Sequence, residues 1–295
     1  MKTFGLIALT MCAFAANSLL NRAALTQGGM DAASFATLRL MSGAVMLAVL
    51  VLATRARMTI AGPGRVAGVA GLLLYIYGFS AAYDALPAGL GALLLFGMVQ
   101  VTMFAAGVLS GESIPAQRWA GAGLAFAGLA YLLLPSGGAA TSLPHALVML
   151  AAGFGWGVYS LAGRLAKAPL DSTATNFAIA AGVGLLVQAG LFAINAGTGA
   201  WIGAWIGGWT GGWTGSGIAL AVVSGAVMSG LGYAVWYAVL PRLPGSVAAV
   251  AQLTVPIIAM AGGMLFLGEP LTLRFALASA LVLGGVAVSV LPLRR

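Results

Sequence analysis

Residues 111–135, GESIPAQRWAGAGLAFAGLAYLLLP, have a counterpart in residues 268–292, GEPLTLRFALASALVLGGVAVSVLP. The same offset of 157 positions extends the match backwards, so that residues 85–135 overlie residues 242–292 without a gap. A repeat about half the chain long indicates two related halves. In a chain that is almost entirely apolar, such a duplication is typical of membrane transporters.

The composition places the chain in a lipid bilayer. Of its 295 residues, 61% are hydrophobic and 6% are charged, and the mean hydropathy is +1.06. A soluble domain carries roughly 25% charged residues, so this chain has too little polar surface to face water. A spanning helix needs about 20 apolar residues. The sequence predicts ten such helices: 3–21, 32–53, 65–83, 87–109, 116–134, 144–164, 173–194, 217–238, 246–267 and 273–292.

The two halves, residues 1–140 and 141–295, contribute five predicted helices each. Because five is odd, the halves must cross the membrane in opposite directions, which makes an inverted repeat. We therefore expect an all-α integral membrane protein with a single membrane domain. A β-barrel is disfavoured, since the apolar runs are continuous and do not alternate with a period of two.

The N-terminus also resembles a secretory signal, with Lys2, an apolar run and Ala13-Phe14-Ala15. We favour a membrane helix, because placing Arg22 on Arg164 gives the first segment a repeat partner at the start of the second half. Cys12 is the only cysteine, so no intramolecular disulfide can form.

The net charge of +8 follows from membrane orientation. With the N-terminus in the cytoplasm, ten basic residues lie on the cytoplasmic side and three, Arg22, Arg39 and Arg274, on the outer side. This asymmetry obeys the positive-inside rule and puts both termini in the cytoplasm. The asymmetry explains the positive net charge without a nucleic-acid partner. We expect the protein to lie in a bacterial inner membrane and to act as a monomer.

All five acidic residues are predicted at helix ends or in loops: Asp31, Asp84, Glu112, Asp171 and Glu269. We expect Glu112 and Glu269 to cap helices or anchor loops, with Arg118 and Arg274 nearby. A proton-coupled antiporter commonly places a carboxylate near the middle of the bilayer, so the distribution favours a facilitator or an exchanger. With a single histidine, His145, no metal centre, cofactor site or enzyme site can be assembled.

Aromatic and amide side chains are the candidates for lining a pathway. Trp156, Tyr159 and Ser160 have the spacing i, i+3, i+4 and share a helical face, and Phe14 and Asn17 occupy the matching positions of the first helix. The complete candidate set for binding a solute is Trp156, Tyr159, Ser160, Asn17, Tyr75, Phe79, Phe96, Gln100, Trp236 and Gln252.

These residues suit a zwitterionic amino acid. Amides and a hydroxyl can bind its carboxylate and ammonium, while rings stack on its side chain. Arg39 is the only basic residue well inside a predicted helix, and it lies towards the outer end. We therefore expect no formal charge near the middle of the bundle, which suits a phosphorylated sugar poorly.

Each candidate also has a plainer interpretation as packing within the bundle. The amides Asn17, Gln100 and Gln252 either bond across helices or face a wet cavity, because an unpaired amide in lipid is costly.

Three prolines are candidate hinges. Pro256 removes a hydrogen bond within a predicted helix and should kink it. Pro87 and its repeat partner Pro244 mark tight joints between successive helices. The loop at 200–215 repeats tryptophan every fourth residue, and we expect it to lie on the outer headgroups.

Several segments together resemble the drug/metabolite transporter superfamily in its ten-helix EamA-like branch. They are FATLRLMSGAVMLAV around Arg39, LYIYGFSAAYDALPAG around Pro87, and the two paired endings quoted above. Within that branch, the chain looks most like the YddG-type exporters of aromatic amino acids. The resemblance implies a central cavity between the halves, alternating access, and export of amino acids or related metabolites.

Other functions remain open at this point. One alternative is a transporter of drugs, and another is a transporter of phosphorylated metabolites. A transporter of phosphorylated metabolites would place Lys or Arg in the cavity. A membrane scaffold without transport of its own would tolerate substitutions of the aromatic face.

Overall fold

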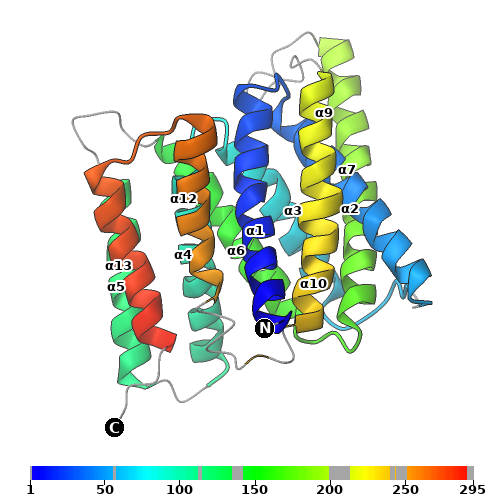
Figure 1. Ribbon diagram of the computed structural model, residues 1–295. Helices are drawn as coiled ribbons and strands as arrows, with labels where there is room; N and C mark the ends of the chain where they lie inside the picture. The colour runs from blue at the N-terminus through cyan, green and yellow to red at the C-terminus, as the bar shows by residue number, and fades with distance from the viewer. Residues whose placement is uncertain are drawn as a thin grey trace.

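The computed structural model describes residues 2–55, 58–111, 115–134, 142–198, 213–239, 243 and 251–290. The chain there is entirely helical (Figure 1). Its elements are α1 (Lys2–Thr26), α2 (Ala32–Ala53), α3 (Arg65–Ala82), α4 (Ala88–Leu109), α5 (Ala116–Leu133), α6 (Leu143–Gly163), α7 (Pro169–Thr198), α9 (Gly215–Val222), the π-helix η1 (Val223–Leu231), α10 (Gly232–Val239), α12 (Thr254–Leu267) and α13 (Leu273–Val290).

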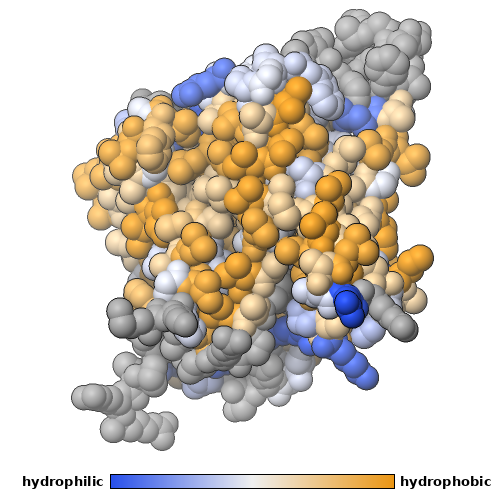
Figure 2. Space-filling view, turned by 45° about the vertical axis from the view of Figure 1, so that its right-hand side comes forward, coloured by the Kyte–Doolittle hydropathy of each residue, from blue (hydrophilic) through white to orange (hydrophobic). Residues whose placement is uncertain are grey.

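Within the described residues, a helix lies at each of the ten predicted positions, although residues 246–250 of the predicted span 246–267 are not described. Elements α9, η1 and α10 follow one another without a break and form a single rod. In the part of the chain that the structure describes, seven segments are long and apolar enough to cross a membrane, and α12 and α13 are shorter apolar helices. An orange apolar band crosses the face in Figure 2, with blue hydrophilic residues towards both ends. This is the surface that a membrane-spanning bundle requires.

The packing follows the sequence repeat. Helix α5 lies along α13, α4 packs on α12 and α2 packs on α7, so three helices contact their own repeat partners. The contact of α3 with α6 recurs between α1 and the α9–η1–α10 rod, and that of α4 with α6 recurs between α1 and α12. Matching contacts of this kind are what a pseudo-twofold axis between two inverted halves produces.

Glu269, in the connection between α12 and α13, joins three parts of the chain. Its carboxylate accepts the backbone N–H of Ala88 at 2.9 and 2.8 Å, and therefore caps the start of α4. It also lies 3.7 Å from Nε of Arg22. Nη1 of Arg22 donates to the carbonyls of Tyr83 and Asp84, where α3 ends. We call this side of the bundle the Glu269 end.

The expected anchoring role of Glu269 agrees with this geometry, and the expected neighbour Arg274 lines the same cavity as Glu269 without forming the ion pair. Arg22 of α1 is its partner, whereas Arg274 donates to the carbonyls of Tyr131 and Leu134 at the end of α5. The repeat partner Glu112 lies outside the described residues.

The close contact of α5 with α13 yields a prediction about stability. A Cβ on Gly121 would overlap the carbonyl of Gly285 and the side chain of Ser289, whereas a Cβ on Gly123 would meet nothing within 4 Å. We expect Gly121→Ala to lower the free energy of unfolding by about 1–3 kcal/mol. Gly123→Ala, the matched control, should be neutral or stabilising because alanine favours helix. Thermal unfolding in detergent measures both, and equal midpoints would contradict this packing.

The Glu269 network yields a prediction about pH. Burial raises the pKa of the Glu269 carboxyl, and the N–H of Ala88 and the charge of Arg22 only partly oppose this effect. A carboxyl whose pKa is higher in the folded state holds its proton more tightly there, so stability falls as pH rises from its ordinary pKa through the raised value. We expect the wild-type thermal midpoint to fall over this window and the Glu269→Gln profile to be flatter. Parallel profiles would show that the pKa of this group is the same in the folded and unfolded states.

Candidate functional site

Aromatic rings from five helical elements meet at the centre of the bundle, with Trp156 of α6 in the middle. Its ring centroid lies 4.8 Å from Tyr75, 5.3 Å from Tyr233, 5.4 Å from Tyr159 and 6.4 Å from Phe14. The central aromatic cluster, as used below, consists of Phe14, Tyr75, Phe79, Trp156, Tyr159, Phe177, Tyr233 and Trp236.

The contact between Phe14 and Trp156 is informative because these residues occupy matching positions in the sequence repeat. Helices α1 and α6 therefore present equivalent faces to the same central point. Transporters built from inverted repeats bind their solutes where the two repeats meet, so this point is the candidate site.

A small cavity of about 10 Å³ lies within the cluster. Its lining comes from α1, α3, α4, α6 and α10: Phe14, Asn17, Ser18, Tyr75, Phe79, Leu95, Phe96, Trp156 and Tyr233. This volume is close to the smallest that holds one water. No amino acid fits in this volume, because the rings occupy the centre.

A π-helical segment supplies the polar edge of this centre. Ser224 Oγ donates to Asn17 Oδ1 at 2.7 Å, and Ser229 Oγ accepts from Arg39 Nε at 3.2 Å. The two serines are five residues apart, which is the hydrogen-bond step of a π-helix. In an α-helix they would point about 140° apart. The π geometry of η1 therefore brings both hydroxyls to the same side of the rod.

Arg39 is buried completely at the centre, with no exposed side-chain surface. Its Nη2 donates to the Tyr75 hydroxyl at 2.9 Å, and its guanidinium carbon lies 5.3 Å from the Tyr75 ring centroid and 5.1 Å from that of Phe79. Both rings line the central cavity. The approach of α2 to η1 is close at this point, since a Cβ on Gly225 would overlap the carbonyl oxygen of Arg39.

The expectation of a centre without formal charge is therefore wrong. Arg39 lies in the first third of α2, but its long side chain reaches Tyr75 and Ser229, which lie near the middle of their helices. An arginine side chain readily extends along its helix in this way.

The predicted solute-binding residues fall into two groups. Asn17, Tyr75, Phe79, Phe96 and Trp156 line the central cavity. The others lie around it: Tyr159 stacks on Trp156, Ser160 donates to the Trp156 carbonyl, Trp236 packs edge-on to Phe14, and Gln100 and Gln252 are half-buried without a place in the lining. Asn17 meets both of its predicted alternatives, since it bonds across helices and lines the cavity.

The candidate hinges lie at helix starts where the structure describes them. Pro87 is the N-cap of α4, and Pro256 lies in the first turn of α12, directly after a turn at Leu253 that interrupts the helical chain. Pro244 and the tryptophan repeat of residues 200–212 lie outside the described residues.

Sequence reasoning missed Arg39, Ser224 and Ser229 as members of this site, and it left Tyr233 out of the candidate set. A signal existed for Arg39, because a charged residue inside an apolar helix is a functional candidate by default. Tyr233 shares the i, i+3 spacing with Trp236. For the serines the sequence held no signal, since their shared direction depends on the π-helix.

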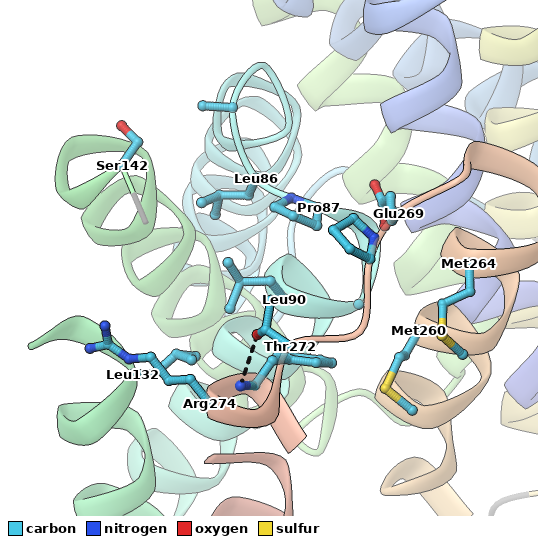
Figure 3. A pocket seen from close by; sticks show the side chains of 14 residues that line it. Leu86, Pro87, Leu90, Leu132, Ser142, Met260, Met264, Glu269, Thr272 and Arg274 are labelled. Carbon is cyan, nitrogen blue, oxygen red and sulfur yellow. Dashed lines mark hydrogen bonds between the residues drawn. The ribbon is translucent and has the colours of Figure 1, made fainter. Parts of the chain in front are cut away.

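A larger cavity of about 430 Å³ lies away from the centre, at the Glu269 end. Figure 3 shows Met260 and Met264 of α12 on one side of it and Leu132 of α5 on the other. Glu269 and Arg274 add charge to a lining that is mostly apolar and also includes Ser142 and Thr272. The cavity is walled by helix ends and does not include the central aromatic cluster.

Comparison with known proteins identifies the family. The profile of the EamA-like transporter family matches residues 143–291. A Pseudomonas aeruginosa relative described as "Uncharacterized protein PA1977" is 46% identical over 291 residues, which cover 99% of this chain and 95% of the relative.

A solved structure described only as "Crystal structure of protein" aligns with a TM-score of 0.63 over 96% of each chain. At 19% identity this likeness concerns the fold alone. The repeat, the helical bundle and the family match agree, and the chain belongs to the EamA-like transporter family.

Proposed function

We propose that this transporter exports amino acids, with aromatic and other neutral amino acids as its preferred solutes. The observation that carries the proposal is the central aromatic cluster closed around a cavity edged by Asn17 and Ser18. Rings offer stacking surfaces for an apolar side chain and faces for an ammonium group. Polar groups at one edge offer hydrogen bonds to the charged end of the same solute.

The proposed mechanism is alternating access. The closed centre must open to admit an amino acid, and the rings that fill it come from helices of both halves. The four acidic residues of the described chain lie at helix ends or in connections, away from this centre. This placement supports facilitated diffusion or weakly coupled exchange over proton-driven transport.

The proposed orientation places both termini in the cytoplasm of a bacterial inner membrane. The Glu269 end then faces outwards, and the Arg22–Glu269 pair lies on the outer side of the closed centre. The bias of basic residues towards the opposite side supports this assignment.

A second candidate solute class is favoured by one observation. Arg39 places a positive charge beside the rings of the cavity, as a carrier of phosphorylated metabolites would require. A sugar phosphate therefore belongs in the same transport assay as the amino acids.

The proposal predicts the behaviour of purified protein in liposomes. We expect labelled phenylalanine and other neutral amino acids to enter without an imposed ion gradient. Trp156→Ala removes the ring that contacts four others, and it should lower phenylalanine flux about tenfold or more while changing the preference among amino acids.

Trp119→Ala is the matched control, because Trp119 lies 54% exposed on α5 and packs only on Phe104 among the rings of the described residues. Its flux should equal that of the wild type. Accumulation of amino acid against its gradient under an imposed pH gradient would refute the uncoupled mechanism. If the sugar phosphate crosses the membrane and no amino acid does, the solute class is phosphorylated metabolites and the proposal of amino acids is wrong.

A further inference from the structure

The Arg39 guanidinium has more donors than partners. Its five N–H groups have an acceptor in Ser229 for Nε and in the Tyr75 hydroxyl for Nη2. Nη1 is buried and has no hydrogen-bond partner within the part of the chain that the structure describes. A buried donor without an acceptor costs free energy, so the position favours a ligand that supplies one.

The charge is unmatched as well. Across residues 2–55, 58–111, 115–134, 142–198, 213–239 and 251–290, the structure places no carboxylate within ion-pair distance of Arg39. Asp31 caps α2, and Glu269 pairs with Arg22. Removing a cation from water costs several kcal/mol unless an anion or a set of acceptors compensates it.

The two rings beside Arg39 hold it without neutralising it. Tyr75 and Phe79 present their ring faces to the guanidinium, which the rings attract. The rings carry no net negative charge, so they do not neutralise Arg39. The same rings also line the central cavity. Opening the cavity requires these rings to move aside, and Nη1 of the adjacent Arg39 still has no acceptor among the described residues.

We infer that Arg39 is the anchor for the carboxylate of the transported solute, an inference that rests on the proposed function. Two N–H groups in one plane match the two oxygens of a carboxylate. One positive charge also matches one carboxylate, whereas a phosphate monoester carries about −1.5 to −2 at neutral pH and would remain uncompensated. The aromatic cluster then receives the side chain of the same amino acid.

The first test uses the folded wild-type protein and needs no variant of Arg39. Binding is measured by ligand-induced thermal stabilisation for phenylalanine, 3-phenylpropionate, phenylalaninamide and phenyl phosphate. These probes share a ring and differ in the group offered to Arg39. We expect both carboxylates to bind at least tenfold more tightly than the amide, and phenyl phosphate to bind more weakly than either carboxylate.

The second test locates the selectivity at Arg39. Arg39→Gln should weaken phenylalanine binding about ten- to hundredfold, as expected for loss of a charged hydrogen-bond donor, and should abolish the preference for acid over amide. Arg39→Lys keeps the charge but loses the planar pair of donors, so it should fall between the two. Arg55→Lys, an exposed arginine at the end of the same helix, is the matched control and should bind as the wild type does.

The outcomes separate the two hypotheses. If phenylalanine binds and crosses the membrane but its amide binds equally well, Arg39 is a structural clamp, and the inference is overturned while the proposed function stands. Tighter binding of phenyl phosphate than of either carboxylate would overturn the carboxylate assignment. If no carboxylate binds folded wild-type protein, the proposed function fails and the inference with it. If Arg39→Gln does not fold, the four probes on the wild-type protein still show whether a carboxylate is preferred over the amide and the phosphate.

Discussion

The burial of one guanidinium constrains the whole centre of this bundle. Arg39 can lie out of water only because a hydroxyl from α3, a hydroxyl from η1 and two ring faces surround it. These groups come from segments far apart in the chain, so satisfying one side chain fixes three helical elements relative to one another. Gly225 allows the required approach of η1 to α2, because any Cβ there would strike the Arg39 backbone.

The π-helix follows from the same requirement. Asn17 and Arg39 belong to different helices, and each needs a partner on the α9–η1–α10 rod. A regular α-helix could direct only one of Ser224 and Ser229 towards the centre. A π-helical turn directs both, at the expense of less regular backbone packing, and such segments occur frequently at functional sites. The local irregularity and the central polar contacts thus have one physical origin.

The centre and the Glu269 end use charge differently. At the Glu269 end, the carboxylate is matched by Arg22 and by the first N–H of α4, so the local charges are compensated and the helix ends are tied together. At the centre, Arg39 has no anionic partner in the described chain. A compensated pair stabilises one arrangement of helices, whereas the uncompensated charge beside the central cavity is the basis for the proposed carboxylate site.

The sequence by itself determined the membrane class, the ten helices and the repeat that relates the two halves. Hydropathy and repetition are properties of contiguous segments, so they can be recognised in the sequence without knowledge of how the helices pack. The spacing of Trp156 and the position of Asn17 also identified part of the cavity lining in advance, because helical periodicity fixes which residues share a face.

Only the tertiary structure decided which helices meet and what their side chains contact. Arg39 donates a hydrogen bond to Ser229, 190 positions away. The π-helix that directs Ser229 towards Arg39 is not indicated by any local sequence pattern. Likewise, Glu269 pairs with Arg22 and not with Arg274, five residues along the chain, because the loop before α13 turns towards α1 and α4. Contacts between distant segments depend on how whole helices pack, and that information is absent from any single stretch of sequence.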